Sequence, residues 1–209
     1  MCAKRLCLPD PAAAVTDELI ASHIEPNSRV IDLGCGDARL LEKLRDDLGA
    51  SVLGIEIDQE GILGTIGRGV PVVQANLDEP LSDIPDQSFD FAVLSQTLQQ
   101  VRRPKDLLQE MMRIAHRALV VVPNFGYWKI RLQVLRSRKT PVTEALPYEW
   151  YETPNLHYMT LHDMHDLAEQ LGYRITTEIQ IINGHTVERA WGANFRAESA
   201  LFIIENTTS

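Results

Sequence analysis

Residues 29–37 read Arg-Val-Ile-Asp-Leu-Gly-Cys-Gly-Asp, and they give the strongest indication of the fold. Its first five residues are mostly apolar, which is typical of a buried strand, and the glycines that follow allow the backbone to turn sharply. A helical pattern begins directly after the turn, so the free amides of a helix N-terminus point toward any ligand bound there. The stretch therefore predicts a ligand site at the carboxyl end of the first strand. The candidate residues in this turn are Asp32, Gly34, Cys35 and Gly36.

Apolar runs and helical patterns alternate along the first two thirds of the chain. The expected strands are residues 29–33, 51–57, 70–74, 89–95, 118–122, 175–182 and 200–204. The expected helices are residues 10–24, 38–48, 104–116 and 160–172. This alternation is typical of a parallel sheet covered by helices, and the last two strands are expected to pair antiparallel. The sequence thus predicts an α/β fold, a Rossmann-like, doubly wound and mostly parallel sheet with an antiparallel last strand.

Length and composition indicate one domain over residues 1–209, with a longer insertion at about residues 123–160. The chain is 44% hydrophobic and 23% charged, which excludes wholesale disorder. The net charge of −9 disfavours nucleic acid as a partner, because polyphosphates need a basic face. No apolar run is long enough to cross a membrane, and the first residues lack the apolar core of a secretory signal. The 3 cysteines have no metal-ligand spacing and are interpreted as reduced thiols, so we expect a soluble, cytoplasmic protein.

Two carboxylates at the ends of the first two strands narrow the choice of ligand. A dinucleotide fingerprint requires a third glycine where this chain has Arg39. S-adenosylmethionine carries an amino group and no phosphate, so the carboxylate of Asp32 suits it. Glu56, near the end of the second strand, is expected to accept hydrogen bonds from both ribose hydroxyls, a device that NAD enzymes share.

The remaining candidate residues follow strands that neighbour the glycine turn. After the strand over residues 70–74, Asn76 is expected to bond adenine and Leu77 to cover the adenine face. Ile57 and Ser95 end two further strands of the predicted sheet. Because the carboxyl ends of parallel strands meet at one edge, these side chains are expected to surround one ligand.

Several segments resemble known families. Asp32–Gly36, Glu56 and Asp90–Leu94 are similar to the motifs of class I S-adenosylmethionine-dependent methyltransferases. The segments Leu94–Gln99, Val122–Trp128 and Leu146–Asn155 resemble those of the MetW family, and the likeness covers roughly residues 28–185 in the same order. One departure is Ala38, which stands where methyltransferases often carry a third glycine.

The resemblance implies the class I methyltransferase fold, with S-adenosyl-L-methionine or S-adenosyl-L-homocysteine as the bound cofactor. It also implies a role in methionine biosynthesis, as an auxiliary or regulatory partner of the homoserine O-acyltransferase MetX. A methyltransferase of a small-molecule acceptor stays the alternative, and an RNA methyltransferase is a weaker one. A homo-oligomer stays open beside these.

No dedicated catalytic motif follows the fourth strand, so the catalytic residues and the enzymatic activity stay undetermined. Polar side chains stand there instead, and they are hydrogen-bonding groups rather than bases: Gln96, Thr97, Gln99 and Gln100. They fit the polar start of a helix as well as a ligand-facing role. Asn124, after the fifth strand, is interpreted as a residue that stabilises its loop.

Three histidines and Cys35 invite a metal or base hypothesis. His162 and His165 lie three residues apart beside aspartates, a pattern more typical of a solvated helix face than of a metal site. His157 is the better pocket candidate, although a structural histidine is the favoured interpretation. Cys35 is interpreted as a small packing residue, because no partnered histidine is identifiable from the spacing. No metal is expected.

The insertion contains a basic stretch flanked by aromatic residues. The basic residues are Lys129, Arg131, Arg136, Arg138 and Lys139, and the aromatic ones are Tyr127, Trp128, Tyr148, Trp150 and Tyr151. Interleaved apolar residues predict an amphipathic helix, which is interpreted as a docking surface or a lid over the ligand, or as an RNA-binding helix. The acidic net charge favours a solvated or docking helix over an RNA-binding one. A partner is expected to bind these anchors: Tyr127, Trp128, Trp150 and Tyr151, with Arg131 and Arg136 meeting carboxylates.

Overall fold

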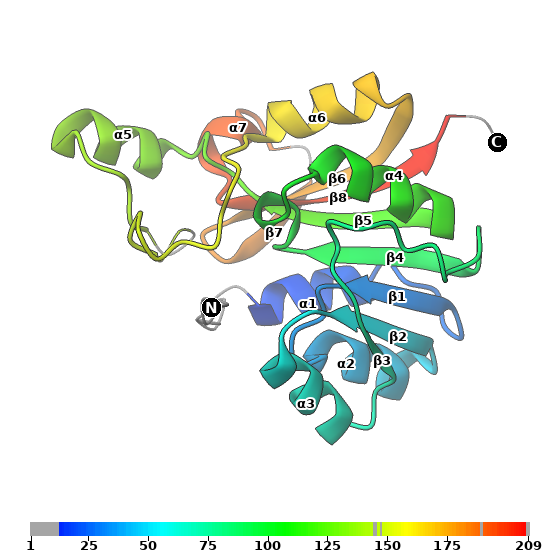
Figure 1. Cartoon of the computed structure of the whole chain (residues 1–209). Helices are drawn as coiled ribbons and strands as arrows, with labels where there is room; N and C mark the ends of the chain where they lie inside the picture. The colour runs from blue at the N-terminus through cyan, green and yellow to red at the C-terminus, as the bar shows by residue number, and fades with distance from the viewer. Residues whose placement is uncertain (1–12, 144–145, 147, 189, 208–209) are drawn as a thin grey trace.

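The computed structural model describes residues 13–143, 146, 148–188 and 190–207, which contain an eight-stranded sheet (Figure 1). The strands are β1 (Arg29–Leu33), β2 (Ser51–Glu56), β3 (Val72–Gln74), β4 (Phe89–Ser95), β5 (Ala115–Pro123), β6 (Tyr173–Ile182), β7 (His185–Glu188) and β8 (Ser199–Asn206). Their order across the sheet is β3-β2-β1-β4-β5-β8-β6-β7. Neighbours from β3 to β5 pair parallel, whereas β8 pairs antiparallel with both β5 and β6. The predicted fold class, including the antiparallel last strand, is confirmed.

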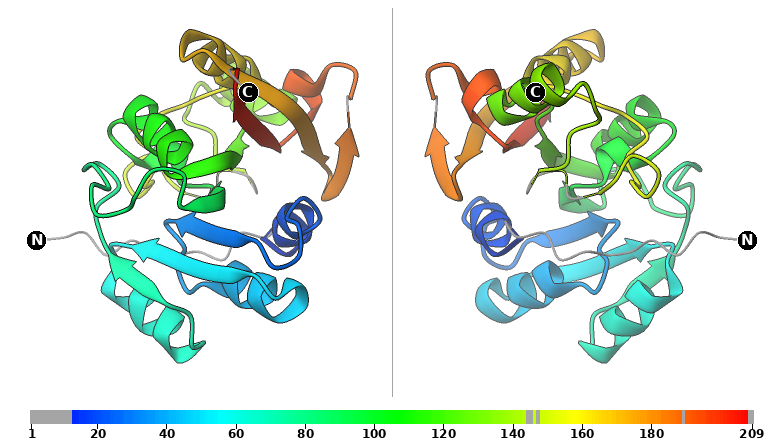
Figure 2. Two further views of the ribbon diagram at one scale, coloured as in Figure 1. Left: turned by 90° about the vertical axis from the view of Figure 1, so that its right-hand side faces the viewer. Right: turned by 90° about the vertical axis from the view of Figure 1, so that its left-hand side faces the viewer.

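Helices cover both faces of this sheet (Figure 2). They are α1 (Ala13–Ala21), α2 (Arg39–Leu48), α3 (Gln59–Gly67), α4 (Pro104–Ile114), α5 (Trp128–Ser137), α6 (Leu161–Gln170) and α7 (Ala193–Arg196), with a 3-10 turn at Leu98–Gln100. Buried side chains of α1 and α2 pack on one face of the sheet, and those of α4 and α6 pack on the other. Figure 1 shows that α5 instead projects away from the layered body.

The alternation of side chains along a strand explains the two core layers. In β1, Val30 joins the layer under α1 and α2, whereas Ile31 and Leu33 join the layer under α4 and α6. On α2, Leu41 and Leu44 have no exposed surface. Burying each leucine stabilises the fold by about 2 kcal/mol, so these periodic positions hold the helix on the sheet.

All four predicted helices differ from the structure in their boundaries, and the last of them, α6, covers Leu161–Gln170 rather than residues 160–172. Residues 10–12 lie outside the described residues, and α1 ends at Ala21, where Ser22 Oγ donates to the Leu19 carbonyl at 2.7 Å. The second helix begins at Arg39, one residue later than expected, because Ala38 has a left-handed φ of 58°. The third ends at Ile114, before the predicted residue 116.

A side chain from outside the helix explains why α4 ends early. Gln87 Nε2 donates to the carbonyls of Met112, Arg113 and Ala115 at 3.1 to 3.2 Å. These bonds satisfy acceptors that a continuing helix would use itself. The fifth strand therefore begins at Ala115, three residues before its predicted start.

Two elements were not predicted, and each has a local cause. Helix α3 contains glycines at 61, 64 and 67, which obscure its apolar pattern, but Asp58 caps it by accepting from the amides of Glu60 and Gly61. Strand β7 forms a hairpin with β6, because Asn183 and Gly184 both adopt positive φ at 51° and 73°. The predicted antiparallel pairing of the two late strands is confirmed as β6 with β8.

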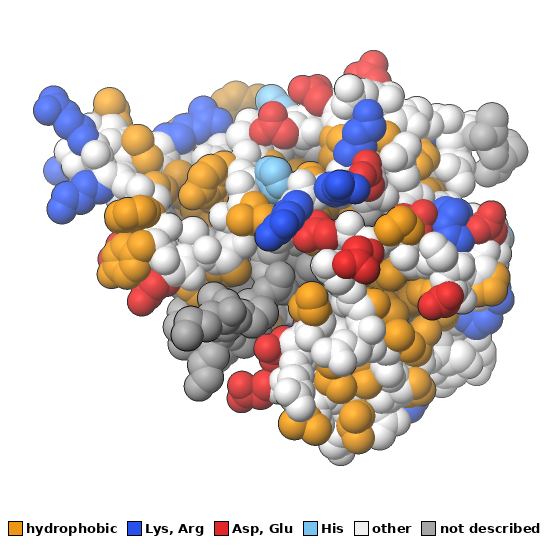
Figure 3. All heavy atoms as spheres, viewed as in Figure 1, with side chains coloured by type: hydrophobic (Ala, Val, Ile, Leu, Met, Phe, Trp, Pro, Cys, Tyr) orange, Lys and Arg blue, Asp and Glu red, His pale blue; other side chains and the backbone are white. Residues whose placement is uncertain are grey.

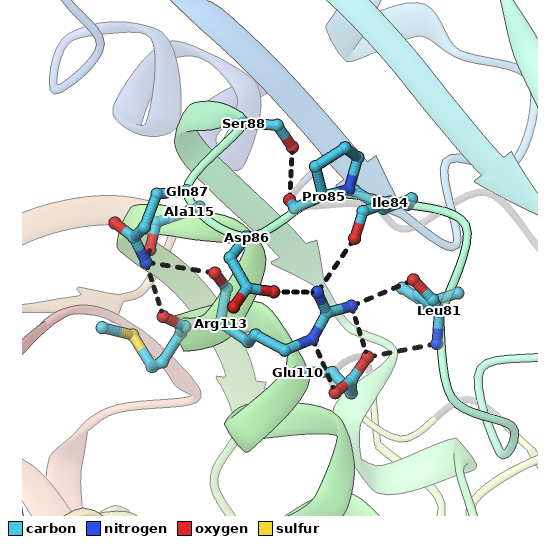
Figure 4. A network of polar contacts seen from close by, with 10 residues as sticks. Leu81, Ile84, Pro85, Asp86, Gln87, Ser88, Glu110, Arg113 and Ala115 are labelled. Carbon is cyan, nitrogen blue, oxygen red and sulfur yellow. Dashed lines mark hydrogen bonds and ion pairs between the residues drawn. The ribbon is translucent and has the colours of Figure 1, made fainter.

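Arg113 of α4 holds the loop before β4 against this helix through hydrogen bonds and ion pairs (Figure 4). Its guanidinium donates to the carbonyls of Leu81 and Ile84 at 2.9 Å and pairs with Glu110 at 2.9 Å and with Asp86 at 2.5 Å. The Glu110 carboxylate also accepts from the Leu81 amide at 3.1 Å. One side chain thus satisfies backbone carbonyls of a segment that has no regular structure.

We expect Arg113→Met to lower the free energy of unfolding by about 2 kcal/mol, because partly buried carbonyls and a carboxylate lose a charged donor. Urea denaturation measures this loss. The exposed Lys105 of the same helix provides the matched variant, Lys105→Met, which should change stability by less than about 0.5 kcal/mol. Equal effects of the two substitutions would contradict the role given to Arg113.

Candidate functional site

The glycine turn lies where β1 passes into α2, and its backbone is fixed by the neighbouring strand. The amides of Gly34 and Cys35 both donate to the Ile55 carbonyl of β2, at 2.8 and 3.1 Å. Gly34 and Gly36 have positive φ values of 84° and 57°, a conformation that strains residues with a side chain. The predicted turn therefore exists, and it is held beside the end of β2.

Ala38 occupies the position at which the sequence departs from the methyltransferase pattern. It adopts the left-handed conformation that favours glycine, with φ 58°, and it is completely buried. Its side chain belongs to the core layer beneath α1 and α2. The alanine thus accepts backbone strain of about 1 kcal/mol while filling space in that layer.

Glu56 ties the end of β2 to the glycine turn. Its Oε2 accepts from the Gly36 amide at 2.9 Å, and its Oε1 accepts from the amides of Ile57 and Asp58 at 2.7 and 2.8 Å. A carboxylate that receives such charge-assisted bonds is held rigidly, yet its oxygens have further lone pairs for a ligand. The structure brings Glu56 to the turn, as the spacing predicted, and adds a role in holding the turn that the sequence did not reveal.

The carboxylate of Asp32 is buried beside the glycine turn, and one of its oxygens has no partner among the described residues. Only 4% of its surface is exposed, and its Oδ1 has no hydrogen-bond partner among the described residues. Burial, together with the nearby carboxylates of Asp17 and Glu56, raises the pKa of Asp32 to about 7. An unpartnered carboxylate among other carboxylates has a strong preference for a cation at this point.

Helix α1 contributes residues to this site that sequence reasoning missed. Asp17 is buried and pairs with Arg39 of α2 at 2.7 Å, and the hydroxyl of the adjacent Thr16 is buried without a partner in the described chain. Neither position belongs to a motif, because the two residues simply fall on the inward face of an apolar helix. Only the packing of α1 against α2 brings Asp17 near Asp32.

The model of the MetW family, described as methionine biosynthesis protein MetW, matches residues 16–204 of this chain. The chain belongs to the MetW family. The family's description assigns its members to methionine biosynthesis.

A curated relative extends this assignment. The chain is 32% identical over 198 residues to the bifunctional methionine biosynthesis protein MetXA/MetW of Rhodopirellula baltica, covering 90% of this chain. It spans only 32% of that relative's length, about a third, so the relative has a large part to which this MetW-family chain does not correspond.

Solved structures confirm the fold. A SAM-dependent methyltransferase from Thermotoga maritima aligns with a TM-score of 0.70 at 18% identity, covering 93% of this chain and 89% of that one. The [4+2]-cyclase SpnF aligns with a TM-score of 0.68 at 14% identity, covering 94% of this chain and 82% of that one. The MetW-family chain therefore has the class I methyltransferase fold, a fold that also serves a cyclase.

Cys35 of this MetW-family chain is a packing residue. Its sulfur fills the space over Gly54, where an added Cβ would lie only 2.5 Å from Sγ. Burial raises the pKa of the thiol to about 12, and the charges of Asp32 and Glu56 act in the same direction. The thiol is therefore protonated at neutral pH, which agrees with its interpretation as a packing residue. Cys2 and Cys7 lie outside the described residues.

The other candidate residues lie along the same edge of the sheet. Glu56 is in register with Gln74 at the end of β3, and Asn76 and Leu77 follow that end of the strand. Asn76 Oδ1 accepts from the Asp78 amide at 3.1 Å, and Leu77 is half-buried against the core. Ile57 is exposed next to Glu56, and Ser95 ends β4.

The polar residues after β4 largely bond to their own backbone. Gln99 and Gln100 each donate their side-chain amide to the Gln96 carbonyl, at 2.9 and 2.7 Å. The Gln99 carbonyl accepts from the amides of Leu156 and His157 at 2.9 and 3.0 Å, which joins this turn to the insertion. Gln99 Oε1 and His157 Nε2 are buried without partners in the described part of the chain.

Thr97 lies against the glycine turn, so Gly34 cannot carry a side chain without a collision. A Cβ on Gly34 would lie 2.9 Å from both Cγ2 and Oγ1 of Thr97. We expect Gly34→Ala to lower the free energy of unfolding by about 2 kcal/mol, through this contact and the positive φ. In urea denaturation, Gly34→Ala combined with Thr97→Ala should be more stable than the sum of the single effects. Strict additivity would show that Thr97 is not the obstacle.

Two interpretations of the insertion are resolved by its contacts. Asn124 is buried, and its amide group bonds to the Asn194 and Ala197 carbonyls at 3.0 and 2.9 Å and accepts from the Gly126 amide at 2.8 Å. Its role as a loop-stabilising residue is confirmed. The prediction that Tyr127 anchors a partner is wrong, because this ring is buried and its hydroxyl donates to Glu198 at 3.1 Å.

Polar side chains at the start and middle of α6 have structural contacts. Thr160 and Asp163 form the capping box at the helix start, so Asp163 accepts from the Thr160 amide at 2.7 Å. His165 contacts Glu178 of β6 at 2.7 Å.

Among residues 13–143, 146, 148–188 and 190–207, no helix is both long and apolar enough to cross a membrane.

Proposed function

We propose that this chain binds S-adenosyl-L-methionine, or its demethylated product, and acts as an auxiliary subunit of a homoserine O-acyltransferase. The observation that carries the first half is the buried, unpartnered carboxylate of Asp32 beside the glycine turn. It gives the ligand's ammonium group a charged acceptor that no group of the described chain uses.

The rest of the ligand fits the same edge of the sheet. Glu56 accepts from the two ribose hydroxyls with lone pairs that its three amide donors leave available. The backbone of Gly34, Cys35 and Gly36 allows the methionine part to approach closely. Asn76 and Leu77 take the adenine, with Ile57 beside the ribose and Ser95 at the end of β4.

The second half of the proposal rests on the relative that carries both names. In the Rhodopirellula baltica protein, MetXA and MetW are parts of one bifunctional chain, and the present chain corresponds to about a third of its length, 32%. Two activities fused in one species are often separate, associating chains in another. The side chains after β4 support an auxiliary role, because Gln99 and Gln100 donate to a backbone carbonyl and offer no base.

One observation favours the alternative, a methyltransferase of a small-molecule acceptor. Gln99 Oε1 and His157 Nε2 are buried without partners, and Thr97 of the same turn touches the glycine turn. A polar acceptor bound between these groups would satisfy them and lie next to the methyl donor. An acceptor that is already nucleophilic needs only to be positioned.

An acyl-transfer assay separates the two functions. The acyltransferase of the same organism is assayed alone, with this chain, and with this chain plus S-adenosylmethionine. We expect this chain to change the rate, and the cofactor to alter that change. Transfer of labelled methyl to a metabolite extract or to RNA, with no effect on acyl transfer, would instead favour one of the methyltransferase functions.

A further inference from the structure

Helix α5 has large apolar side chains on its exposed side, where a helix that only faces solvent usually has polar ones. Trp128, Leu132 and Leu135 recur at helical spacing along one side of it, and their exposed fractions are 38%, 42% and 77%. Ile130 is the buried residue of this helix, and it packs with Tyr127 and Leu146 in a small separate core. A ten-residue helix attached in this way has little tertiary support of its own, so an apolar stripe on its outer side indicates a binding surface.

The arginines at the end of α5 and at its C-cap differ in their ion pairing from the arginines in the rest of the molecule. Arg29, Arg68 and Arg113, like most arginines of the body, form ion pairs. Arg136 and Arg138 form none with the described residues. Residues 128–143 contain five basic side chains and no acidic one, although the whole chain carries a charge of −9. Figure 3 shows these basic side chains gathered with hydrophobic ones at the projecting end of the molecule.

We propose that the exposed side of α5 docks into an acidic, apolar-lined groove on the acyltransferase partner. This inference rests on the proposed function. Leu132, Leu135 and Trp128 are the apolar anchors, and Arg136 and Arg138 meet carboxylates at the rim of the groove. Helix α7 extends the surface, because Arg131 lies over the ring of its half-exposed Phe195, 5.8 Å from the ring centroid.

The charges and the apolar stripe of α5 favour an acidic protein groove over a second copy of this chain and over nucleic acid. In a two-fold symmetric dimer the same patch meets itself, so Arg136 and Arg138 of both copies would repel one another. Nucleic acid would use the arginines but would leave Leu132 and Leu135 exposed to water. An acidic protein groove satisfies both sets of side chains at once.

The test measures the affinity of the purified acyltransferase for variants of this chain by calorimetry. Leu132→Ser with Leu135→Ser should raise Kd at least about 30-fold, because both anchors lose their buried apolar surface. Leu63→Ser with Ile66→Ser is the matched control on α3, where the two side chains are 62% and 59% exposed at the same spacing. The control should bind like the wild type.

Charge reversal provides a second, independent variant. Arg136→Glu with Arg138→Glu should raise Kd about tenfold at low salt, mainly through slower association, and less at 0.5 M salt. The exposed Arg102, just before α4, and the exposed Lys105, on α4, provide the control reversal.

Four outcomes are informative. Weakened binding confined to the α5 variants supports the docking surface. Unchanged binding of the α5 variants to an acyltransferase that binds the wild type overturns the docking surface alone. Failure of the wild-type chain to bind the acyltransferase contradicts the proposed function itself. A dimer in sedimentation velocity, or a labelled RNA complex, that is lost only in the α5 variants assigns the surface to that occupant and overturns the inference.

Discussion

Asp32→Asn is expected to stabilise the ligand-free protein at pH 8 and to weaken its binding of S-adenosylmethionine at least tenfold. Folding raises the pKa of this carboxyl from 3.8 to about 7, chiefly through burial. The folded state therefore binds more protons than the unfolded state between these two values, and stability falls as the pH rises through that window. Above pH 7 the buried charge costs about 4 kcal/mol, and asparagine removes that cost.

The same carboxylate makes ligand binding depend on pH. A cationic ammonium group prefers ionised Asp32, so affinity should be constant above about pH 7.5 and fall about tenfold per pH unit below pH 6.5. Calorimetry in buffers of different ionisation enthalpy measures the proton released on binding. Asp32→Asn should remove both the proton release and the part of the pH dependence due to the protein. Unchanged stability and unchanged binding of this variant would contradict the role given to Asp32.

Glu56→Ala is expected to raise the Kd for S-adenosylmethionine at least 100-fold and to lower the free energy of unfolding by about 3 kcal/mol. The alanine removes the acceptor of the ribose hydroxyls, and it leaves the amides of Gly36, Ile57 and Asp58 without their shared partner. Calorimetry and urea denaturation measure the two effects separately.

Glu60 offers a control with the same change of charge. It is exposed on the first turn of α3, so Glu60→Ala should leave both quantities near their wild-type values. A ligand without the ribose 2′-hydroxyl distinguishes recognition from turn stability. It should bind the wild type more weakly than S-adenosylmethionine does, and this difference should shrink in the Glu56→Ala variant. If the difference persists, Glu56 only supports the turn.

The parts of the fold that could be predicted depend on local rules. The first strand and its turn were readable because an apolar run, two glycines and a helical pattern occur together in residues 29–37. The pairing of β6 with β8 followed from two apolar strands separated by turn residues. Helix α3 was not readable, because its glycines obscure the periodicity and only the cap at Asp58 marks its start.

Some residues of the candidate site could likewise be predicted from the sequence, and others could not. Asp32 and Glu56 could be predicted because each ends a strand, and strand ends meet at one edge of a parallel sheet. Asp17 could not, because its place near Asp32 depends on the packing of α1 against α2. The burial of Tyr127 could not be predicted either, because its partner Glu198 is distant in sequence.

Calorimetric titration of the wild-type chain with S-adenosylmethionine at pH 8 shows whether the glycine turn and its two carboxylates bind this ligand. We expect heat with a stoichiometry near one, binding of S-adenosylhomocysteine at the same site, and a rise in Tm with either ligand. Glu60→Ala should reproduce this result and Glu56→Ala should not. Absence of both heat and thermal shift with the two ligands would show that the chain does not bind them.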